Sequence, residues 1–546
     1  MKKSGGFNKF ALALALLLWG FFVLTLPTLD FDEALYRRVA EGMKTTHNLW
    51  SLTWDGRDLF HKPPVFYWLI VLFSRFIDGE SGFVSAQAAR LPSFFSTIAI
   101  LMYLYVSGNR IKKEKAPITG FLSATALLCG LFPVLTATGV IFDPLQTLLL
   151  MPALVVPTIL FYDEKKLRTH DWFLWASSLF AASAVKGLNG LIVPCFAFAL
   201  HLLFLTRYLG LQKIISWTIK FLLRVFLPAT MVTLAYYFWL DAKIGRAFTH
   251  EFIWIQHFER GTSPMEQHSG SFFYQFLVVA FGGGVLTTLL LSRFEKIKST
   301  FFALGFPITY CLSFCIIFGL SATKLPHYSW PVWPALALSL GLASADSGEN
   351  LKLQTVTRLQ RVWMLLARLP LLLVALFCFG LAFAPQVLLG LFSANKSFWG
   401  VVHYFNGFHV LEIASLTLAA TLCLCFEWKR DDLIKSVPSC AVFTLSIAFF
   451  MTAGLTRVVQ ELLVNPFYEI ANSVKKDGAQ TNDCIRYSGT FSPTLSLALA
   501  PELIHNRCEP EDMRYLIAPE WKSSECEERH FKVIDQKAYL VLCKKG

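Results

Sequence analysis

Residues 7–40 read F-N-K-F-A-L-A-L-A-L-L-L-W-G-F-F-V-L-T-L-P-T-L-D-F-D-E-A-L-Y-R-R-V-A, an apolar run that ends in a group of carboxylates. The stretch from Phe7 to Leu26 is long enough to cross the hydrocarbon core of a bilayer. No small-x-small cleavage pattern follows it, so we expect a retained helix rather than a secretory signal. Two lysines precede the run, which predicts a cytoplasmic N-terminus and places Asp30, Asp32 and Glu33 at the outer end of the helix.

The composition extends this prediction to the whole chain. The 546 residues are 55% hydrophobic and 16% charged, with a mean hydropathy of +0.51. This is more apolar surface than one soluble core could bury, so the sequence predicts a polytopic α-helical membrane protein. The net charge of +12 does not indicate a nucleic-acid partner, because the lysines and arginines lie in short clusters between apolar runs. Such clusters are typical of topology signals and of contact with anionic lipids.

Apolar runs long enough to span the bilayer recur along the chain. After the first, we expect spans near residues 84–108, 117–135, 141–162, 171–186, 187–206, 221–240, 272–291, 301–320, 329–344, 363–384, 405–426 and 437–456. This gives about thirteen transmembrane helices, and the basic clusters between them then all fall on the cytoplasmic side. Counting the shorter apolar run at 63–76 as a crossing would turn every later cluster outward. We therefore predict an interfacial or partly inserted helix there, inside a long outer loop of residues 29–83.

The last part of the chain differs in composition from the rest. Residues 1–456 form the predicted transmembrane domain, and residues 457–546 form a small extracytoplasmic α/β domain, since an odd number of spans places the tail outside. Short strand-like runs occur at 484–487, 515–517, 531–534 and 538–542, with a helix-compatible stretch at 493–500.

Four cysteines lie in this tail, at positions 484, 508, 526 and 543. In a small extracytoplasmic domain they favour two disulfides, with three possible pairings, and a reduced core is the alternative. A zinc site is disfavoured because the tail has no C-x-x-C spacing.

Several cations on the outer side of this topology break the positive-inside pattern. They lie in the strings D-G-R-D-L-F-H-K-P-P-V-F-Y-W-L (55–69), A-V-K-G-L-N-G (184–190), H-F-E-R-G-T-S-P-M (257–265) and S-A-T-K-L-P-H-Y-S-W-P (321–331). Cations beside Pro, Gly and aromatic residues at an outer membrane face suit the binding of a lipid-linked phosphate or pyrophosphate. The alternatives are single cations that snorkel toward head groups and an ordinary interfacial aromatic belt. The candidate substrate-binding residues are Tyr36, Arg57, Lys62, Arg90, Lys186, Arg260, Lys324 and Tyr328.

Carboxylates at outer helix ends are the candidate catalytic groups. A carboxylate near several cations can accept a proton from an acceptor hydroxyl or orient the donor sugar. The candidates are Asp32, Glu33 and Asp143. Helix capping is the alternative for each, and it suits Asp143 in particular because Pro144 follows it.

No cofactor is expected to be required. Weaker candidates for a divalent metal site are His257, Glu259 and His268.

Five strings in a fixed order resemble a known family. They are D-E-A-L-Y-R-R-V-A-E-G-M (32–43), H-K-P-P-V-F-Y-W-L (61–69), A-A-R-L-P-S (88–93), V-K-G-L-N-G (185–190) and K-L-P-H-Y-S-W-P-V-W-P-A-L-A-L (324–338). Over about residues 10–456 the chain resembles the bacterial aminoarabinose transferase and protein mannosyltransferase group of GT-C glycosyltransferases. The resemblance implies transfer of a sugar from a polyprenyl-phosphate donor to lipid A or another envelope acceptor, at the periplasmic face of the bacterial inner membrane.

The resemblance also implies roles for individual residues. Asp32 matches an acid that is essential in such enzymes, and Asp143 matches an acid of the second outer loop. Donor-phosphate or acceptor contacts are implied for Tyr36, Lys62, Arg260 and Lys324. The chain departs from the family where an Arg-Tyr pair is common, because it has Leu35 before Tyr36.

Other functions remain open at this point. A protein or glycan acceptor is the alternative within the same fold. A transporter or flippase for a lipid-linked glycan would predict internal repeats and mid-span charges, whereas the charges gather at outer helix ends. A non-catalytic scaffold whose tail recruits a partner is the third possibility.

Overall fold

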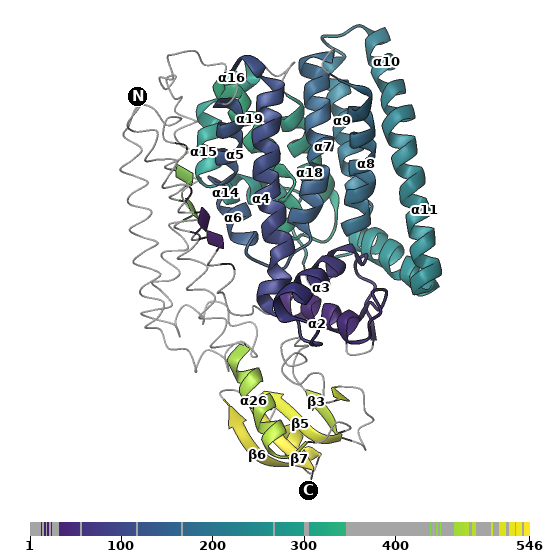
Figure 1. Cartoon of the computed structure of the whole chain (residues 1–546), viewed down its shortest axis with the longest axis vertical. Helices are drawn as coiled ribbons and strands as arrows, with labels where there is room; N and C mark the ends of the chain where they lie inside the picture. The colour runs from purple at the N-terminus through teal and green to yellow at the C-terminus, as the bar shows by residue number, and fades with distance from the viewer. Residues whose placement is uncertain are drawn as a thin grey trace.

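The computed structural model describes residues 32–54, 57–115, 118–164, 167–265, 268–299 and 305–345, together with parts of 464–545 and isolated positions near residues 13–23 and 437–448. In this part of the chain, long helices form a bundle, and a small sheet lies beyond one end of it (Figure 1). The predicted spans at 363–384 and 405–426, and most of those at 7–26 and 437–456, lie outside the described residues.

Most bundle helices coincide with predicted spans. The bundle helices are α4 (Ala86–Ile111), α5 (Ile118–Leu127), α6 (Leu131–Thr136), α7 (Asp143–Tyr162), α8 (Thr169–Lys186), α9 (Asn189–Leu205), α10 (Leu211–Phe221), η3 (Leu222–Phe226), α11 (Leu227–Ile244), α14 (Tyr274–Gly282), α15 (Val285–Ser292), α16 (Phe294–Ser299), α18 (Phe306–Leu320) and α19 (Val332–Ala345). Helices α10 and α16 form in stretches that were predicted to be basic cytoplasmic loops, and α10 extends the span predicted at 221–240 back to residue 211. Among the described residues, α4, α7 and the continuous helix 211–244 are long and apolar enough to cross a membrane, and α14 with α15 forms a candidate span bent by 94°. The predicted helical membrane fold is confirmed, and the total of about thirteen spans stays a prediction.

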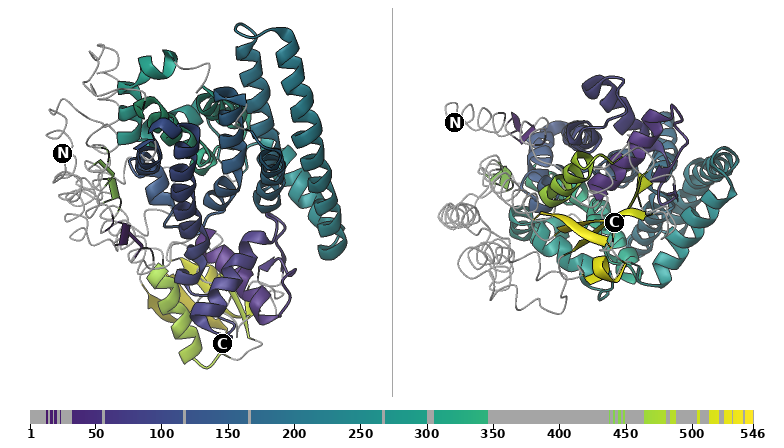
Figure 2. Two further views of the ribbon diagram at one scale, coloured as in Figure 1. Left: turned by 45° about the horizontal axis from the view of Figure 1, so that its top comes forward. Right: turned by 90° about the horizontal axis from the view of Figure 1, so that it is seen from below.

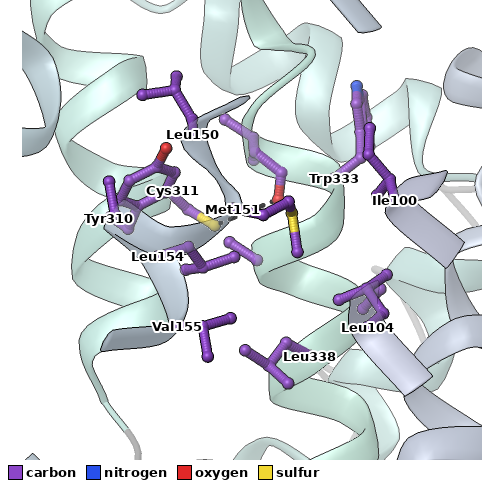
Figure 3. Packing of buried hydrophobic residues seen from close by; sticks show 14 of the residues in the cluster. Ile100, Leu104, Leu150, Met151, Leu154, Val155, Tyr310, Cys311, Trp333 and Leu338 are labelled. Carbon is purple, nitrogen blue, oxygen red and sulfur yellow. Dashed lines mark hydrogen bonds between the residues drawn. The ribbon is translucent and has the colours of Figure 1, made fainter. Parts of the chain in front are cut away.

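Close backbone approach and apolar packing hold the bundle together. A Cβ atom on Gly108 would lie 2.9 Å from Cα of Gly120, so α4 and α5 can meet at this distance only because both residues are glycines. Figure 3 shows the core beside them, where Leu104 of α4, Leu154 of α7 and Leu338 of α19 pack with side chains of α18. The rigid bundle positions the helix ends at which the charged residues lie.

The predicted outer loop is largely helical. It contains α2 (Asp32–Thr45), the short strands β1 (Thr53–Trp54) and β2 (Arg57–Asp58), and α3 (Val65–Asp78). The helix expected at 63–76 is present as α3, whose 14 residues are too few to span a bilayer. The sequence analysis did not predict α2. Its acidic first turn and the Lys44 in its last turn complement the helix dipole, and Leu35, Val39 and Met43 bury one face.

A five-stranded sheet lies near the C-terminus. Its strands are β3 (Cys484–Tyr487), β4 (Ile504–His505), β5 (Met513–Pro519), β6 (Phe531–Lys537) and β7 (Leu540–Lys545), in the order β4-β3-β5-β7-β6. β3 is parallel to β4 and β5, whereas β7 is antiparallel to β5 and β6. Phe467, Ile470 and Val474 of α26 (Asn465–Lys476) share a buried cluster with residues of β3, β5 and β7. Short α28 (Ser524–Glu528) precedes β6.

The three cysteines that the structure describes in this region are disulfide-bonded. Cys526 and Cys543 form a disulfide between α28 and β7. Cys484 is also disulfide-bonded, and its partner lies outside the described residues. Both observations agree with the prediction of disulfides in the tail.

A buried ion pair joins α2 to α4. Arg90 Nε and Nη2 donate to the two carboxylate oxygens of Glu33 at 3.0 and 2.7 Å, and Arg90 Nη1 donates to the carbonyl of Val23 at 3.3 Å. The exposed fractions are 0% for Arg90 and 4% for Glu33. A pair with this bidentate geometry fixes the start of α2 against the bundle.

Substitution of Arg90 by Leu is expected to lower the free energy of unfolding by about 3–5 kcal/mol, because it leaves the Glu33 carboxylate buried without its cation. The measurement is the melting temperature of the detergent-solubilised protein. Arg75→Leu is the matched control, since Arg75 and Glu80 form an exposed pair at 4.0 Å that contributes no more than about 1 kcal/mol. Equal melting temperatures for the two variants would contradict the assignment.

Candidate active site

Charged side chains from separate segments meet where α7 begins and α8 ends. Lys62 follows β2, Lys186 is the last residue of α8, and Arg260 follows the π-helix η4 (His250–Glu259). All three line one cavity of about 470 Å³. Positive charges that are distant in the sequence thus share one site, as the sequence analysis predicted for a phosphate-binding region.

The pKa of Lys62 reflects the positive charges that surround it. The pKa of Lys62 is lowered to about 7, chiefly by burial and in addition by the positive charges of Arg260 and Lys186, against the opposing effect of Asp143 and Asp32. A lysine whose pKa is depressed by burial and by neighbouring cations gains stability when an anion binds beside it. The cavity therefore favours an anionic ligand.

Asp143 and Lys186 form a buried pair inside the site. Asp143 is the first residue of α7, and the Lys186 ammonium donates to its Oδ1 atom. The same ammonium lies 5.0 Å from the centroid of the Tyr328 ring, close enough for a cation–π contact. The structure thus brings together three residues that the sequence analysis had proposed from separate strings.

Arg260 is fixed by neighbours on two segments. Its Nη1 atom donates to Gln256 Oε1 at 2.7 Å. Its carbonyl accepts from the backbone N–H of Thr323 at 3.3 Å, and the next carbonyl, of Gly261, accepts from Ala322 at 2.8 Å. The segment after η4 is therefore paired, backbone to backbone, with residues 321–324.

Lys324 has a different place from the one predicted for it. Its buried ammonium donates to the carbonyls of Phe318 at 3.3 Å, of Gly319 at 2.6 Å and of Ser321, at the C-terminal end of α18. It is not among the residues that line the cavity. A cation on the last carbonyls of a helix stabilises that helix end. Lys324 supports the site indirectly, because it fixes the segment that pairs with Arg260.

Asp32 and Glu33 point to different surroundings although they are adjacent. The Asp32 side chain is exposed, and its charge acts on Tyr36 and Lys62, which places it beside the cavity. Glu33, one residue on, pairs with Arg90 inside the protein. The structure therefore brings Asp32 to the cation cluster and assigns Glu33 and Arg90 to the junction of α2 and α4.

Tyr36 packs against other aromatic side chains of this region. Its ring meets those of Phe142 and Tyr67 edge to face, at centroid distances of 5.0 and 5.9 Å. Burial raises the pKa of Tyr36, and the charge of Asp32 raises it further, so its hydroxyl is a hydrogen-bond donor at neutral pH. The side chain of Arg57 lies outside the described residues.

The weaker metal candidates do not converge. His257 Nδ1 donates to the carbonyl of Phe252 at 2.7 Å, and its Nε2 atom accepts from the backbone N–H of Leu188 at 3.0 Å, so both ring nitrogens are engaged. Glu259 and His268 are exposed. Among the residues that the structure describes, no three His, Cys, Asp or Glu side chains are grouped so that they could hold a metal ion.

The structure adds one residue that the sequence analysis missed. His327, in the short helix η5 (Pro326–Ser329), faces the same charges as Lys62. Burial lowers the pKa of His327 to about 4, and the cations Lys186, Lys62 and Arg260 contribute to the shift while Asp143 opposes it. Its place directly before Tyr328 in the string K-L-P-H-Y was the available signal.

Part of the remaining cavity wall is apolar. Side chains of α9 and α18 form this part, namely Ile192, Val193, Ile317, Phe318 and Leu320, whereas Asn189, Gln256, His257, Thr262 and Ser321 add polar groups elsewhere. A cavity with cations at one place and a wall of aliphatic and aromatic groups at another suits an amphiphile that carries an anionic head. The chemistry of the lining therefore matches a lipid-linked phosphate.

Substitution of Lys324 by Met is expected to lower the melting temperature, because it removes the cation from the end of α18 and frees residues 321–324. Lys62→Met is expected to leave the melting temperature unchanged or raise it, since it relieves repulsion from Lys186 and Arg260. Thermal unfolding of both variants in the same detergent measures the difference. A stable Lys324→Met protein would place Lys324 in direct ligand contact instead.

The chain is similar in sequence to known sugar transferases. No protein-family model matches the chain. The chain is 23% identical over 440 residues to the undecaprenyl phosphate-alpha-4-amino-4-deoxy-L-arabinose arabinosyl transferase 2 of Proteus mirabilis, with 75% of each chain covered. It is 26% identical over 347 residues to the corresponding transferase of an Enterobacter species, with 59% of this chain and 58% of the relative covered.

The fold is shared with a solved structure. ArnT from Cupriavidus metallidurans bound to undecaprenyl phosphate superposes with a TM-score of 0.72 at 16% identity, over 99% of this chain and 98% of ArnT. The resemblance predicted from the sequence motifs is thereby confirmed: the chain is related in sequence to the undecaprenyl phosphate aminoarabinose transferases and has the fold of ArnT.

Proposed function

We propose that this protein is a membrane glycosyltransferase that takes a sugar from a polyprenyl-phosphate donor and transfers it to lipid A or another envelope acceptor. The observation that carries the proposal is the cavity in which Lys62, Lys186 and Arg260 share one site with an apolar wall, beside Asp32. The relatives add support, since their names specify an undecaprenyl-phosphate-linked aminosugar donor. The ArnT structure of the same fold contains undecaprenyl phosphate.

In the proposed reaction, the bond between the anomeric carbon and the phosphate oxygen breaks, and the acceptor oxygen bonds to that carbon. The electron pair of the broken bond stays on the lipid phosphate. Lys62 and Arg260 neutralise this developing charge, and the fork of Arg260 can contact two phosphate oxygens at once. Lys186 is already paired with Asp143. It therefore contributes positive electrostatic potential to the site and does not offer an ammonium group without a partner.

Asp32 is the proposed catalytic acid–base residue. It lies at the first turn of α2, exposed to an approaching acceptor and close to the cations. If the acceptor is a hydroxyl, Asp32 takes up its proton; if the acceptor is already a phosphate anion, Asp32 chiefly orients the sugar. The Tyr36 hydroxyl is placed one helical turn further on to donate a hydrogen bond to the donor.

We place this end of the molecule in the periplasm of a bacterium, in the inner membrane. The two views of Figure 2 and the view of Figure 1 show the sheet at the end of the bundle where α2 and α3 lie. That sheet carries the Cys526–Cys543 disulfide, which forms and persists in an oxidising compartment. α4 runs from Ala86 near α3 to the basic cluster that begins at Arg110, as expected for a cytoplasmic end.

Asp32→Asn is expected to reduce the rate of sugar transfer by about 10²–10⁴-fold while leaving donor binding intact, since it removes the carboxylate but not the cations. Mass spectrometry of lipid A and envelope glycans from cells that carry each variant measures the product. Asp58→Asn, a change at an exposed acid of the same loop, is the control. Wild-type levels of modification in the Asp32→Asn cells would refute the proposed chemistry.

The affinity for the donor is expected to depend on pH through Lys62. The donor is a phosphodiester of constant charge, and the Lys62 ammonium loses its proton as the pH rises through about 7, so kcat/KM for the donor falls above that pH. Lys62→Arg keeps its charge and should flatten this decline. Steady-state rates between pH 6 and 9 measure it, and identical pH profiles for the two proteins would exclude Lys62 from donor binding.

A further inference from the structure

The segment that carries Arg260 is attached to the turn that carries Lys186 by a single histidine. The backbone N–H of Leu188, two residues after Lys186, donates to His257 Nε2 at 3.0 Å. His257 Nδ1 donates to the Phe252 carbonyl at 2.7 Å, which fixes the ring within η4. His257 precedes Arg260 by one helical turn, so the histidine links the two cationic segments.

Gly187 leaves the space that this contact needs. It ends α8 with a φ of +123°, and a Cβ atom built on it would lie 2.1 Å from His257 Nε2. The same atom would lie 3.1 Å from Cζ of Phe252. Any other residue would therefore displace the imidazole as well as strain the backbone. The contact between the α8–α9 turn and η4 therefore requires both the glycine at position 187 and the histidine at position 257.

The link has to resist a repulsive force. Lys62, Lys186 and Arg260 carry like charges around one cavity, so without a ligand the segments that carry them tend to separate. The imidazole must be neutral to accept from Leu188. Burial lowers the pKa of His257 to about 4, its bond to the Phe252 carbonyl opposes this, and the charges of Lys62 and Arg260 reinforce it. The ring is therefore neutral at physiological pH, and the cations themselves help to keep it so.

We propose that His257 is a positioning residue: by accepting the Leu188 N–H it holds Arg260 at the distance from Lys186 at which both side chains can face one phosphate. The proposal rests on the proposed function of this cavity. His257 also lines the cavity. The role assigned to it acts through Arg260, and the double-mutant cycle below separates this role from a direct contact with the ligand. It also explains why the turn V-K-G-L-N-G has glycine directly after its lysine.

Two substitutions at His257 separate the hydrogen bond from the shape of the ring. In His257→Gln the side-chain oxygen reaches about as far as Nε2 and can still accept from Leu188. In His257→Phe a ring remains but the acceptor is lost. His250→Phe is the matched control, because His250 is exposed on the same π-helix.

The measurement is the binding of undecaprenyl phosphate to the purified full-length protein in detergent. We expect His257→Phe to weaken binding about fivefold to tenfold, the effect of one lost hydrogen bond to a buried group. We expect His257→Gln and His250→Phe to remain within about twofold of the wild type. The KM for the acceptor should not change in any of them. If His257→Phe does not fold, His257→Asn replaces it, since its shorter amide cannot reach Leu188.

A double-mutant cycle tests whether the effect passes through Arg260. In an Arg260→Gln background, His257→Phe is expected to have no further effect on binding, because the group that it positions is gone. Undiminished loss in that background would overturn the proposal, as would equal binding by His257→Phe and His257→Gln. If the wild type itself fails to bind undecaprenyl phosphate, the proposed function fails instead, so the two failures are distinguishable.

Discussion

Three cations that repel one another are held around one half-buried cavity, and much of the surrounding structure restrains them. Each cation comes from a different segment, and each segment has its own attachment. Lys186 is paired with Asp143, the start of α7. Arg260 is tied to residues 321–324 through backbone hydrogen bonds, and its segment is tied to the α8–α9 turn through His257. Because counter-charges such as Asp143 cancel the repulsion only in part and the scaffold balances the rest, an attraction for an anion remains available to a ligand.

The ion pairs of this region fall into two kinds. Glu33 and Arg90 satisfy each other completely inside the protein, and such a pair has no capacity left for a substrate. Around Lys62, burial and the positive charges of Arg260 and Lys186 lower the pKa of the ammonium, and the charges of Asp143 and Asp32 oppose this shift only in part. A charged residue in an outer loop can thus serve folding or binding. Complete pairing indicates the first role, and a crowded, incompletely balanced set indicates the second.

This distinction explains which features of the fold and of the site could be predicted from the sequence and which could not. The alternation of apolar runs and basic clusters predicted most of the helices between residues 84 and 344, and the outer cationic strings predicted that Lys62, Lys186 and Arg260 would share one site. Which side of a helix a residue faces needed the structure. Asp32 and Glu33 are neighbours, but successive residues point about 100° apart on a helix, so the charge of Asp32 acts on Lys62 while Glu33 pairs with Arg90. Lys324 sits in a string typical of phosphate contacts, yet the carbonyls at the end of α18 satisfy its ammonium. α2 was missed because its acids were assigned to the outer end of the preceding apolar span, although they form the first turn of a new helix.

The depressed pKa of Lys62 links the close placement of the three cations to ligand binding. A lysine that is half neutral near pH 7 is recharged when a phosphate binds, so the anion strengthens its own site. When the phosphate leaves, repulsion from Arg260 and Lys186 returns, and the proton can leave again. Incomplete pairing, maintained by neutral contacts such as that of His257, therefore keeps the positive charge of the site available to an anion.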